Sequence, residues 1–423
     1  TIDMPIYAKK NQENHYVILF NIMQSAKNSE SIAYDSNASF TTEGVTLNTQ
    51  QTYNNVPYYN VIITPEKTSK DNLSITLHGG IADGTKINFN ITTSTSAVET
   101  LLFEDSNLDK AIYEYLSNKL GKNSYIARAP YIINITQSEI ANVKELDISS
   151  KEIKNLKGIS NFSNLENLNT SNNKISNDSE IKYLTKLKTL NCSNNELNNS
   201  YTSIEQIPTL ENLDISGNNI KDLNSLSNYI DYMNKNRKTI KLSTLILANN
   251  QITDIQTLSK LTTLQNINIS NNQLNDINNI STNTGITTFN MSGNNIEDIS
   301  VLSKLANLKT LNISNNLIQD ISPISNLALT TLDISGNRIV NIEPIKNQIG
   351  IINLYMNNNK ISDVSNIEGL LLKGEFEAKQ QKLIQVLDKS QTGDITVNLP
   401  PIFKAAKMQS SKVYTATNYS LEN

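Results

Sequence analysis

The side chains that most often perform catalysis or bind metals are scarce in this sequence of 423 residues. Its two histidines, His15 and His78, have no cysteine or pattern of carboxylates near them, so they lack the spacing of metal ligands. The one cysteine, Cys192, excludes an intrachain disulfide and a thiolate-rich metal site. The sequence contains no phosphate-binding loop, dinucleotide glycine motif or nucleophile elbow. It therefore predicts neither an enzyme nor a cofactor.

Acidic side chains recur at a regular interval in the second half of the chain. They are Asp254, Asp276, Asp298, Asp320 and Asp363, with Asn341 at the equivalent place in one interval. No D-x-D-x-D loop of the kind that binds calcium accompanies them. We therefore expect this column to cap turns rather than to catalyse a reaction or hold a metal.

The charge balance argues against two further classes of protein. The formal net charge is −4, and we find no dense cluster of Lys and Arg, so we expect no nucleic-acid partner. No apolar run approaches the roughly 18 residues that a membrane helix needs, so we expect no membrane span.

The elements that position these side chains are repeats. The pattern L-x-x-L-x-L-x-x-N, with other apolar residues at some Leu positions and Lys151 in place of Asn in the first copy, begins ten times between residues 143 and 370, at steps of 21 to 23 residues and one step of 32. In the copy that begins at Leu308, the alternation of Leu311 and Ile313 predicts a short strand with both side chains directed inward. Such self-similarity predicts a leucine-rich repeat array, an α+β repeat solenoid with short parallel strands.

Two further columns of the repeat have a physical role. Asn316 stands where the chain turns off the strand, and an amide can both donate to and accept from the backbone groups that a turn leaves unpaired. Equivalent asparagines should stack as a ladder inside the solenoid. The spacing of Ile318, Ile321 and Ile324 predicts 3₁₀ turns on the convex side.

Two departures from the pattern need an interpretation. The long step carries an insertion over residues 227–241, which we expect to form a short convex helix and interpret as a tolerated surface insertion rather than a binding loop. Cys192 replaces an inward strand residue, so we expect a small buried hydrophobe rather than a reactive thiol.

The flanks of the array predict further domains. Apolar spacing predicts a helix near residues 105–121 within an N-terminal helical cap over 98–142. Strand-like runs at 16–21, 59–64, 73–77 and 86–92 predict an all-β sandwich over 1–97. We expect the array over 143–370 to be followed by a C-terminal cap, a partial β module, over 371–423.

Several of these segments resemble known families. Residues 103–112, 135–136 and 143–149, together with the 22-residue repeat, resemble the cap and first repeat of bacterial internalins. Residues 59–65 and 73–84 look like the closing half of bacterial Ig-like modules. The resemblance implies an internalin-like protein of the cell surface or cell wall of a Gram-positive bacterium, which takes part in adhesion or virulence.

The outward side chains of the strands form the surface on which such arrays bind. Here that surface is mostly Asn, Thr and Ser, whereas protein hot spots favour aromatic residues and Arg. We select Tyr355 and Ile246 first, and acidic residues for a basic partner second. The candidate partner-binding residues are Tyr355, Ile246, Glu145, Asp147, Asp214, Asn312 and Asp333.

Three functions fit this sequence. The first is a monomeric, non-catalytic interaction module that binds a host or matrix protein through its concave strand face. The second is a structural spacer that projects another domain. The third is a module that binds a carbohydrate or the cell wall, because a surface rich in amides and hydroxyls can hydrogen-bond a glycan.

Overall fold

The structure of the chain is a computed structural model. It describes residues 2–6, 16–20, 23–25, 32–34, 39–53, 56–63, 72–78, 84–91, 98–101, 103–120, 133–198, 204–367, 369–370, 372 and 374–381. The chain divides into two compact units, Thr1–Leu165 and Glu166–Asn423.

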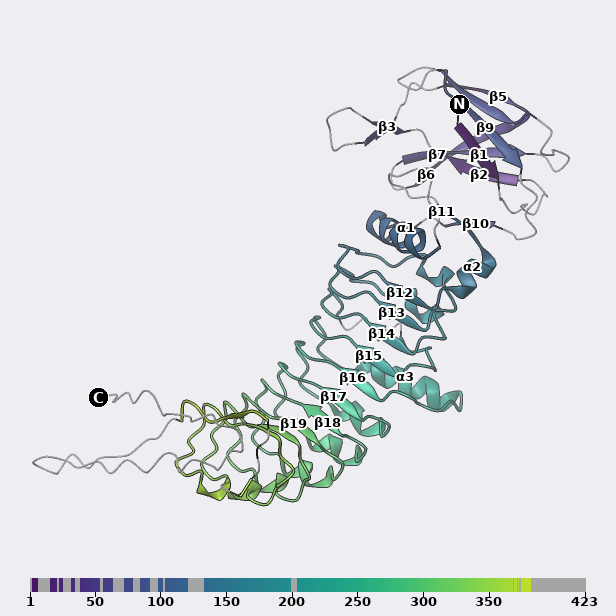
Figure 1. The fold of residues 1–423 in the computed structure, drawn as a ribbon. Coiled ribbons are helices and arrows are strands. Elements are labelled where there is room, and N and C mark those ends of the chain that lie inside the picture. Colours follow the sequence, from purple (N-terminus) through teal and green to yellow (C-terminus); the bar gives the residue numbers. More distant parts are fainter. Residues whose placement is uncertain are drawn as a thin grey trace, which may run out of the picture. The chain divides into compact units, whose positions relative to one another are not determined.

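The N-terminal unit begins with strands (Figure 1). One sheet has the order β1 (Ile2–Ile6), β9 (Lys86–Ile91), β8 (Ser74–His78) and β5 (Ser39–Glu43). A second sheet has the order β2 (Tyr16–Phe20), β7 (Val56–Ile63) and β6 (Thr46–Tyr53), and β3 (Met23–Ser25) pairs with β4 (Ile32–Tyr34). The pairs are antiparallel except β1 with β9, which is parallel. The four strands that the sequence predicted correspond to β2, β7, β8 and β9, so those predictions are confirmed.

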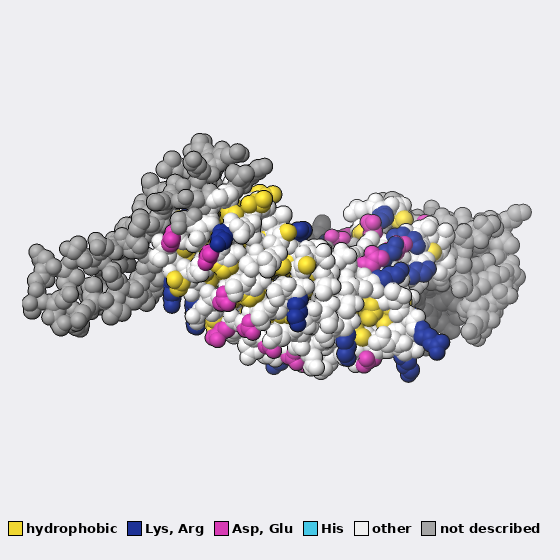
Figure 2. Space-filling model, turned by 90° about the horizontal axis from the view of Figure 1, so that it is seen from below, with side chains coloured by type: hydrophobic (Ala, Val, Ile, Leu, Met, Phe, Trp, Pro, Cys, Tyr) yellow, Lys and Arg dark blue, Asp and Glu magenta, His cyan; other side chains and the backbone are white. Residues whose placement is uncertain are grey.

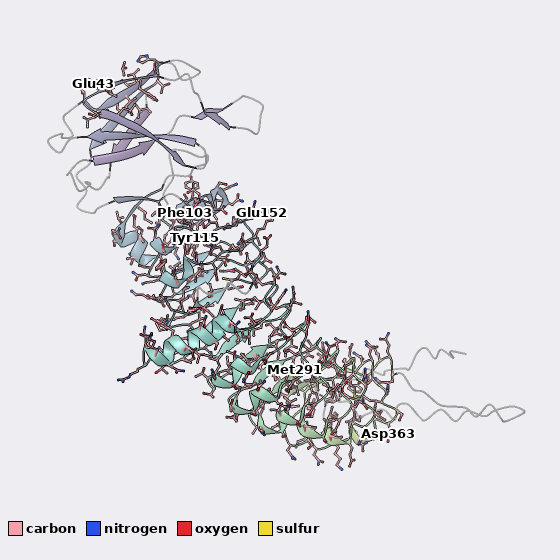
Figure 3. All side chains as sticks on the ribbon, turned by 180° about the vertical axis from the view of Figure 1, so that it is seen from behind. Glu43, Phe103, Tyr115, Glu152, Met291 and Asp363 are labelled. Atoms are coloured by element: carbon pink, nitrogen blue, oxygen red, sulfur yellow. The ribbon has the colours of Figure 1, made fainter. Side chains whose placement is uncertain are left out.

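Two helices and a short β-ribbon follow. They are β10 (Val98–Leu101), α1 (Ser106–Leu120), β11 (Ile133–Thr136) and α2 (Gln137–Asn142), and α1 confirms the predicted helix. The inner face of α1 buries Leu108, Ile112 and Leu116, none of which is exposed to solvent. Phe103, labelled in Figure 3, stacks on the ring of Phe162 with 6.4 Å between the ring centroids. Glu114 of α1 forms a salt bridge of 2.9 Å with Lys151, and the amide of Asn107 donates to the carbonyl of Glu152 at 3.0 Å, so α1 is held against the first repeat.

The repeats form one parallel sheet of eleven strands. The strands are β12 (Glu145–Asp147), β13 (Asn167–Asn169), β14 (Thr189–Asn191), β15 (Asn212–Asp214), β16 (Thr244–Ile246), β17 (Asn266–Asn268), β18 (Thr288–Asn290), β19 (Thr310–Asn312), β20 (Thr331–Asp333), β21 (Asn353–Tyr355) and β22 (Phe376–Glu377). The leucine-rich repeat solenoid that the sequence predicted is therefore confirmed.

The last strand, β22, lies beyond residue 370, where the repeat pattern of the sequence stops. Phe376 pairs with Leu354 of β21, and Gln381 takes the place of the ladder asparagine. Its side-chain oxygen accepts a hydrogen bond of 3.0 Å from the backbone N–H of Ile361. The sheet thus continues one strand further than the sequence indicated, with Gln in the role of Asn.

The side of the solenoid opposite the sheet holds 3₁₀ helices. They are η1 (Ile159–Asn161), η2 (Ile181–Tyr183), η4 (Gln256–Lys260), η5 (Asn278–Thr282), η6 (Ser300–Lys304), η7 (Ser322–Ile324), η8 (Glu343–Ile345) and η9 (Ser365–Ile367). The long step forms α3 (Asn224–Lys235), which buries Leu226, Tyr229, Ile230 and Met233. The predicted 3₁₀ turns and the predicted convex helix are both confirmed.

The core of the solenoid consists of the inward strand residues, the apolar turn residues and the asparagine ladder. Leu311 and Ile313 are fully buried, as is Met291, which Figure 3 labels. The amide nitrogen of Asn316 donates to the carbonyls of Met291, Ile313 and Ser314 at 3.1 Å each. Each ladder amide therefore binds its own turn and the preceding repeat, so that neighbouring repeats complete each other's core.

Candidate interaction surface

The strand face of the solenoid presents two side chains per strand. In β19, Leu311 is buried whereas Thr310 and Asn312 are partly exposed, and β16, β18, β20 and β21 repeat this pattern. The register that the sequence predicted therefore holds along these strands. In Figure 2, which shows one side of the molecule, the coloured and white part has scattered charged side chains on a white ground of uncharged polar side chains and backbone.

A depression of about 420 Å³ lies on this face. Its lining comprises Thr244, Ile246, Asn266, Ile267, Asn268, Thr288, Phe289, Asn290, Thr310, Leu311, Asn312, Thr331, Asp333 and Tyr355. The structure thus brings together four of the seven candidate residues, Ile246, Asn312, Asp333 and Tyr355. Asp214 lies on β15 outside this lining, and Glu145 and Asp147 lie on β12 of the N-terminal unit.

The polar candidates also hold their own turns. The Oδ1 atoms of Asn312 and Asp333 each accept a hydrogen bond of 2.9 Å from the backbone N–H two residues later. Asp214 does the same for Ser216, and Asp147 for Ser149. One oxygen of each side chain is therefore committed to the turn, which leaves the amide nitrogen of Asn312 and the second oxygen of Asp333 for a ligand.

Tyr355 is held by a residue that sequence reasoning missed. Its hydroxyl donates a hydrogen bond to a carboxylate oxygen of Glu375, which immediately precedes β22. The hydrogen bond to Glu375, followed by burial, raises the pKa of Tyr355 to about 12. The backbone N–H of Glu375 donates in turn to Asn353 at 2.9 Å. In the sequence, the sign that Glu375 lies beside Tyr355 is its position one repeat of 22 residues after Asn353.

The carboxylates near Tyr355 differ in whether a basic side chain neutralises their charge. Glu377 accepts from Lys379 at 2.9 Å and from Asn357 at 2.8 Å, and the hydrogen bond from Lys379 is the main cause of its lowered pKa. Within the described part of the chain, no lysine or arginine forms an ion pair with Asp333 or Glu375. These two carboxylates therefore give this end of the depression an uncompensated negative charge.

A second hollow, of about 510 Å³, lies beside the end of the insertion. It is lined by Glu211, Lys241, Ser243, Thr262, Thr263, Gln265 and Gly285, none of which the sequence had selected. The hydroxyl of Thr263 donates to the carbonyl of Leu242 at 2.6 Å, and that of Ser243 donates to Glu211 at 3.3 Å. These two hydroxyls therefore donate within the fold, and the side-chain donors that remain in the lining are those of Lys241, Thr262 and Gln265.

The acidic column of the convex side caps turns, as the sequence predicted. Asp298 accepts from the backbone N–H of Ser300 at 2.8 Å, and Asp254, Asp276, Asp320 and Asn341 make the same bond in their repeats. In the ranges that the structure covers, no three His, Cys, Asp or Glu side chains gather as a metal site would require. His78 pairs with the hydroxyl of Thr41 at 2.8 Å, and His15 lies outside the described residues.

None of the helices in those ranges has the length and hydropathy that crossing a membrane requires.

Comparison with known proteins supports the repeat class. The family model of paired leucine-rich repeats matches residues 240–282 and 284–326, so the chain carries leucine-rich repeats there. No curated protein sequence matches the chain.

Solved structures extend the likeness. An internalin (inlF) of Listeria monocytogenes is similar with a TM-score of 0.52 and 26% identity, over 64% of this chain and 81% of that one. Internalin C2 of the same species has a TM-score of 0.47 and 28% identity, over 56% and 94%. A leucine-rich repeat protein of Leptospira interrogans has a TM-score of 0.50 and 23% identity, over 58% and 62%. The chain is thus a leucine-rich repeat protein with internalins among its structural neighbours.

Proposed function

We propose that this chain is a non-catalytic interaction module of an extracellular bacterial surface protein, and that it binds a host or matrix protein through its concave strand face. One observation carries the proposal. Ile246 and Tyr355 belong to different repeats far apart in the chain, yet they line the same depression. The depression thus offers a protein partner two separate anchors, one aliphatic and one aromatic, and tyrosine is among the residues that hot spots favour.

The surface location rests on the likeness to the internalin from Listeria monocytogenes, which is 26% identical and has a TM-score of 0.52. It supports a place at the cell surface or cell wall of a Gram-positive bacterium and a role in adhesion or virulence. The repeat fold is one that typically binds other proteins rather than catalysing reactions. We further propose that residues 1–97 form an Ig-like spacer, that 98–142 cap the array over 143–370, and that 371–423 close it.

The test is binding of the purified chain to epithelial cells and to immobilised matrix proteins. The variant Ile246→Ser with Tyr355→Ser removes both anchors while it keeps the inward core residues. A matched control, Tyr183→Ser with Val340→Ser, removes an aromatic and an aliphatic side chain that are 53% and 58% exposed outside the depression. Saturable binding that only the first variant loses would support the proposal.

Two other outcomes would replace it. If neither the native chain nor either variant binds saturably, the structural spacer is favoured. Binding to a polysaccharide array but not to proteins would favour the carbohydrate module, since the Asn and Thr side chains of the strand face can hydrogen-bond sugar hydroxyls.

A further inference from the structure

The depression on the strand face follows one column of side chains, which we call the track, and the two ends of this column carry different side chains. One column of side chains pairs across successive strands from Ile246 through Asn268, Asn290, Asn312 and Asp333 to Tyr355. Five steps at about 4.8 Å between strands make this track about 24 Å long. An extended peptide advances about 3.3 Å per residue, so about seven residues would span it.

The middle of the track offers hydrogen-bond donors. The Oδ1 atoms of Asn268, Asn290 and Asn312 each accept from the serine N–H two residues later, at 3.0, 3.0 and 2.9 Å. Their amide nitrogens donate to no atom of the described residues. A column of amide donors with no cation among them suits the carbonyl oxygens of a peptide backbone.

The two ends differ in chemistry. Ile246 supplies aliphatic surface at the first end. At the other end the ring of Tyr355 lies between Asp333, its partner on the adjacent strand, and Glu375, which accepts a hydrogen bond from its hydroxyl. Neither carboxylate forms an ion pair within the described residues. A guanidinium fits this arrangement, because its planar donors pair with carboxylates and its face stacks on an aromatic ring.

We propose that the track binds an extended peptide segment of a protein partner that places an arginine against Tyr355, Asp333 and Glu375 and an apolar side chain, about seven residues away, against Ile246. This specificity rests on the function proposed above. Charge complementarity favours a peptide that carries arginine, since the lining of the depression contains no basic residue and its one charged residue is Asp333.

The probe is a display library of random twelve-residue peptides selected on the full chain. We expect enriched sequences to share an arginine and an apolar residue separated by about six to eight positions. The enriched peptide is then synthesised with arginine and with citrulline, which keeps the shape of the side chain and removes its charge. Citrulline should weaken binding to the native chain about tenfold or more, as expected when hydrogen bonds to charged groups are lost.

Two substitutions remove the carboxylate charges that we expect to bind the arginine. Asp333→Asn keeps the oxygen that accepts from Ser335 and introduces the residue that β17, β18 and β19 carry at this place. Glu375→Gln keeps an acceptor for Tyr355. We expect the pair of changes to weaken the arginine peptide about tenfold or more and to leave the citrulline peptide unaffected. Asp214→Asn is the matched control, because Asp214 makes the same turn bond outside the depression.

The contrary outcomes separate this inference from the proposed function. The inference is overturned if the enriched peptides need Ile246 and Tyr355 but share no arginine. It is also overturned if the paired variant weakens the arginine peptide and the citrulline peptide equally. Both outcomes leave the proposed function standing. If no enriched peptide depends on Ile246 and Tyr355, the track is not a peptide site, and binding to cells and matrix proteins alone decides the proposed function.

Discussion

The side-chain oxygen of Asn272 accepts a hydrogen bond of 3.0 Å from the backbone N–H of Ile252, in the preceding repeat. The amide nitrogen of Asn272 donates at 3.0 to 3.1 Å to the carbonyls of Leu247, Ile269 and Ser270. One buried side chain thus satisfies backbone groups of two successive repeats. The same set of bonds recurs along the ladder, so the solenoid depends on polar contacts as well as on its apolar columns.

Asn272→Leu should therefore lower the free energy of unfolding by about 2 kcal/mol or more, because it leaves buried N–H and C=O groups without partners. Urea denaturation followed by circular dichroism measures the change. Asn275→Leu is the control, since the same substitution is made at an exposed position of the same repeat. A loss below about 0.5 kcal/mol for Asn272→Leu, the usual range of surface changes, would refute the structural role of the ladder.

Gly293 marks a second column, where the residue before the ladder asparagine has a left-handed backbone. Its φ is +66°, and a Cβ atom there would lie 2.1 Å from the side-chain oxygen of Asn271. We expect Gly293→Ala to destabilise the chain by about 1–2 kcal/mol through backbone strain, plus the cost of displacing Asn271. Gly285→Ala is the control, because the nearest atom to its Cβ would be 3.5 Å away and its backbone is unstrained. Equal midpoints of denaturation for the two variants would contradict this argument.

The solenoid could be predicted from the sequence because every repeat carries the same pattern of strand and turn residues. Leu311 and Ile313 alternate as a strand requires, and Asn316 marks the turn. The eleventh strand could not be predicted in this way, since Phe376, Ala378 and Gln381 replace Leu, Ile and Asn at the equivalent positions. Glu375 was missed for that reason, and with it the partner of the Tyr355 hydroxyl.

The candidate site was predictable only in outline. The register placed Asn312 and Asp333 on the strand face, but it could not show that a side-chain oxygen of each accepts a hydrogen bond from the backbone of its own turn. The same turn leaves Ser314, which follows β19, only 5% exposed. Hydrogen bonds between a side chain and the backbone two residues away depend on the turn geometry, which spacing alone does not reveal.

Asp105 connects the helical cap to the first repeat. One carboxylate oxygen accepts from the N–H groups of Asn107 and Leu108 at 2.8 and 3.2 Å, and the other from Lys154 and Asn155 at 2.7 and 3.1 Å. Asp105→Ala should cost about 1–2 kcal/mol, as the loss of a helix cap does. Hydrogen exchange should show faster exchange in α1.

Asp231→Ala provides the control for Asp105→Ala. Asp231 is an exposed aspartate in the middle of α3, where it caps no helix. Its loss should leave both the stability of the chain and the exchange of α1 unchanged. If the two variants behave alike, Asp105 does not anchor the cap.

Cys192 is fully buried, and burial raises the pKa of its thiol to about 12. Only the thiolate reacts with disulfide reagents, so the native chain at pH 8 should react roughly 1,000-fold more slowly than the urea-unfolded chain. The release of chromophore from an aromatic disulfide reagent measures both rates. Fast modification of the native chain would mean that the thiol is neither buried nor protonated.

The hydrogen bond from Tyr355 to Glu375 makes a prediction for alkaline pH. The pKa of Tyr355 lies at about 12 in the folded chain, above the usual value of about 10 for tyrosine. A raised pKa favours the protonated form of the folded chain. Its contribution to stability is therefore complete below about pH 10 and is lost as the pH rises through about 12.

Glu375→Gln should bring the pKa of Tyr355 down toward the usual value, because it removes the charged acceptor that is the main cause of the shift. Tyrosine ring carbons followed by NMR titration measure this, with Tyr355→Phe to assign the signal. Tyr229 is an internal control: burial alone raises its pKa to about 12, so its titration should not move in the Glu375→Gln variant. If Tyr355 titrates at the same pH in both chains, Glu375 does not hold its hydroxyl. If both tyrosines shift, the substitution has disturbed the solenoid as a whole.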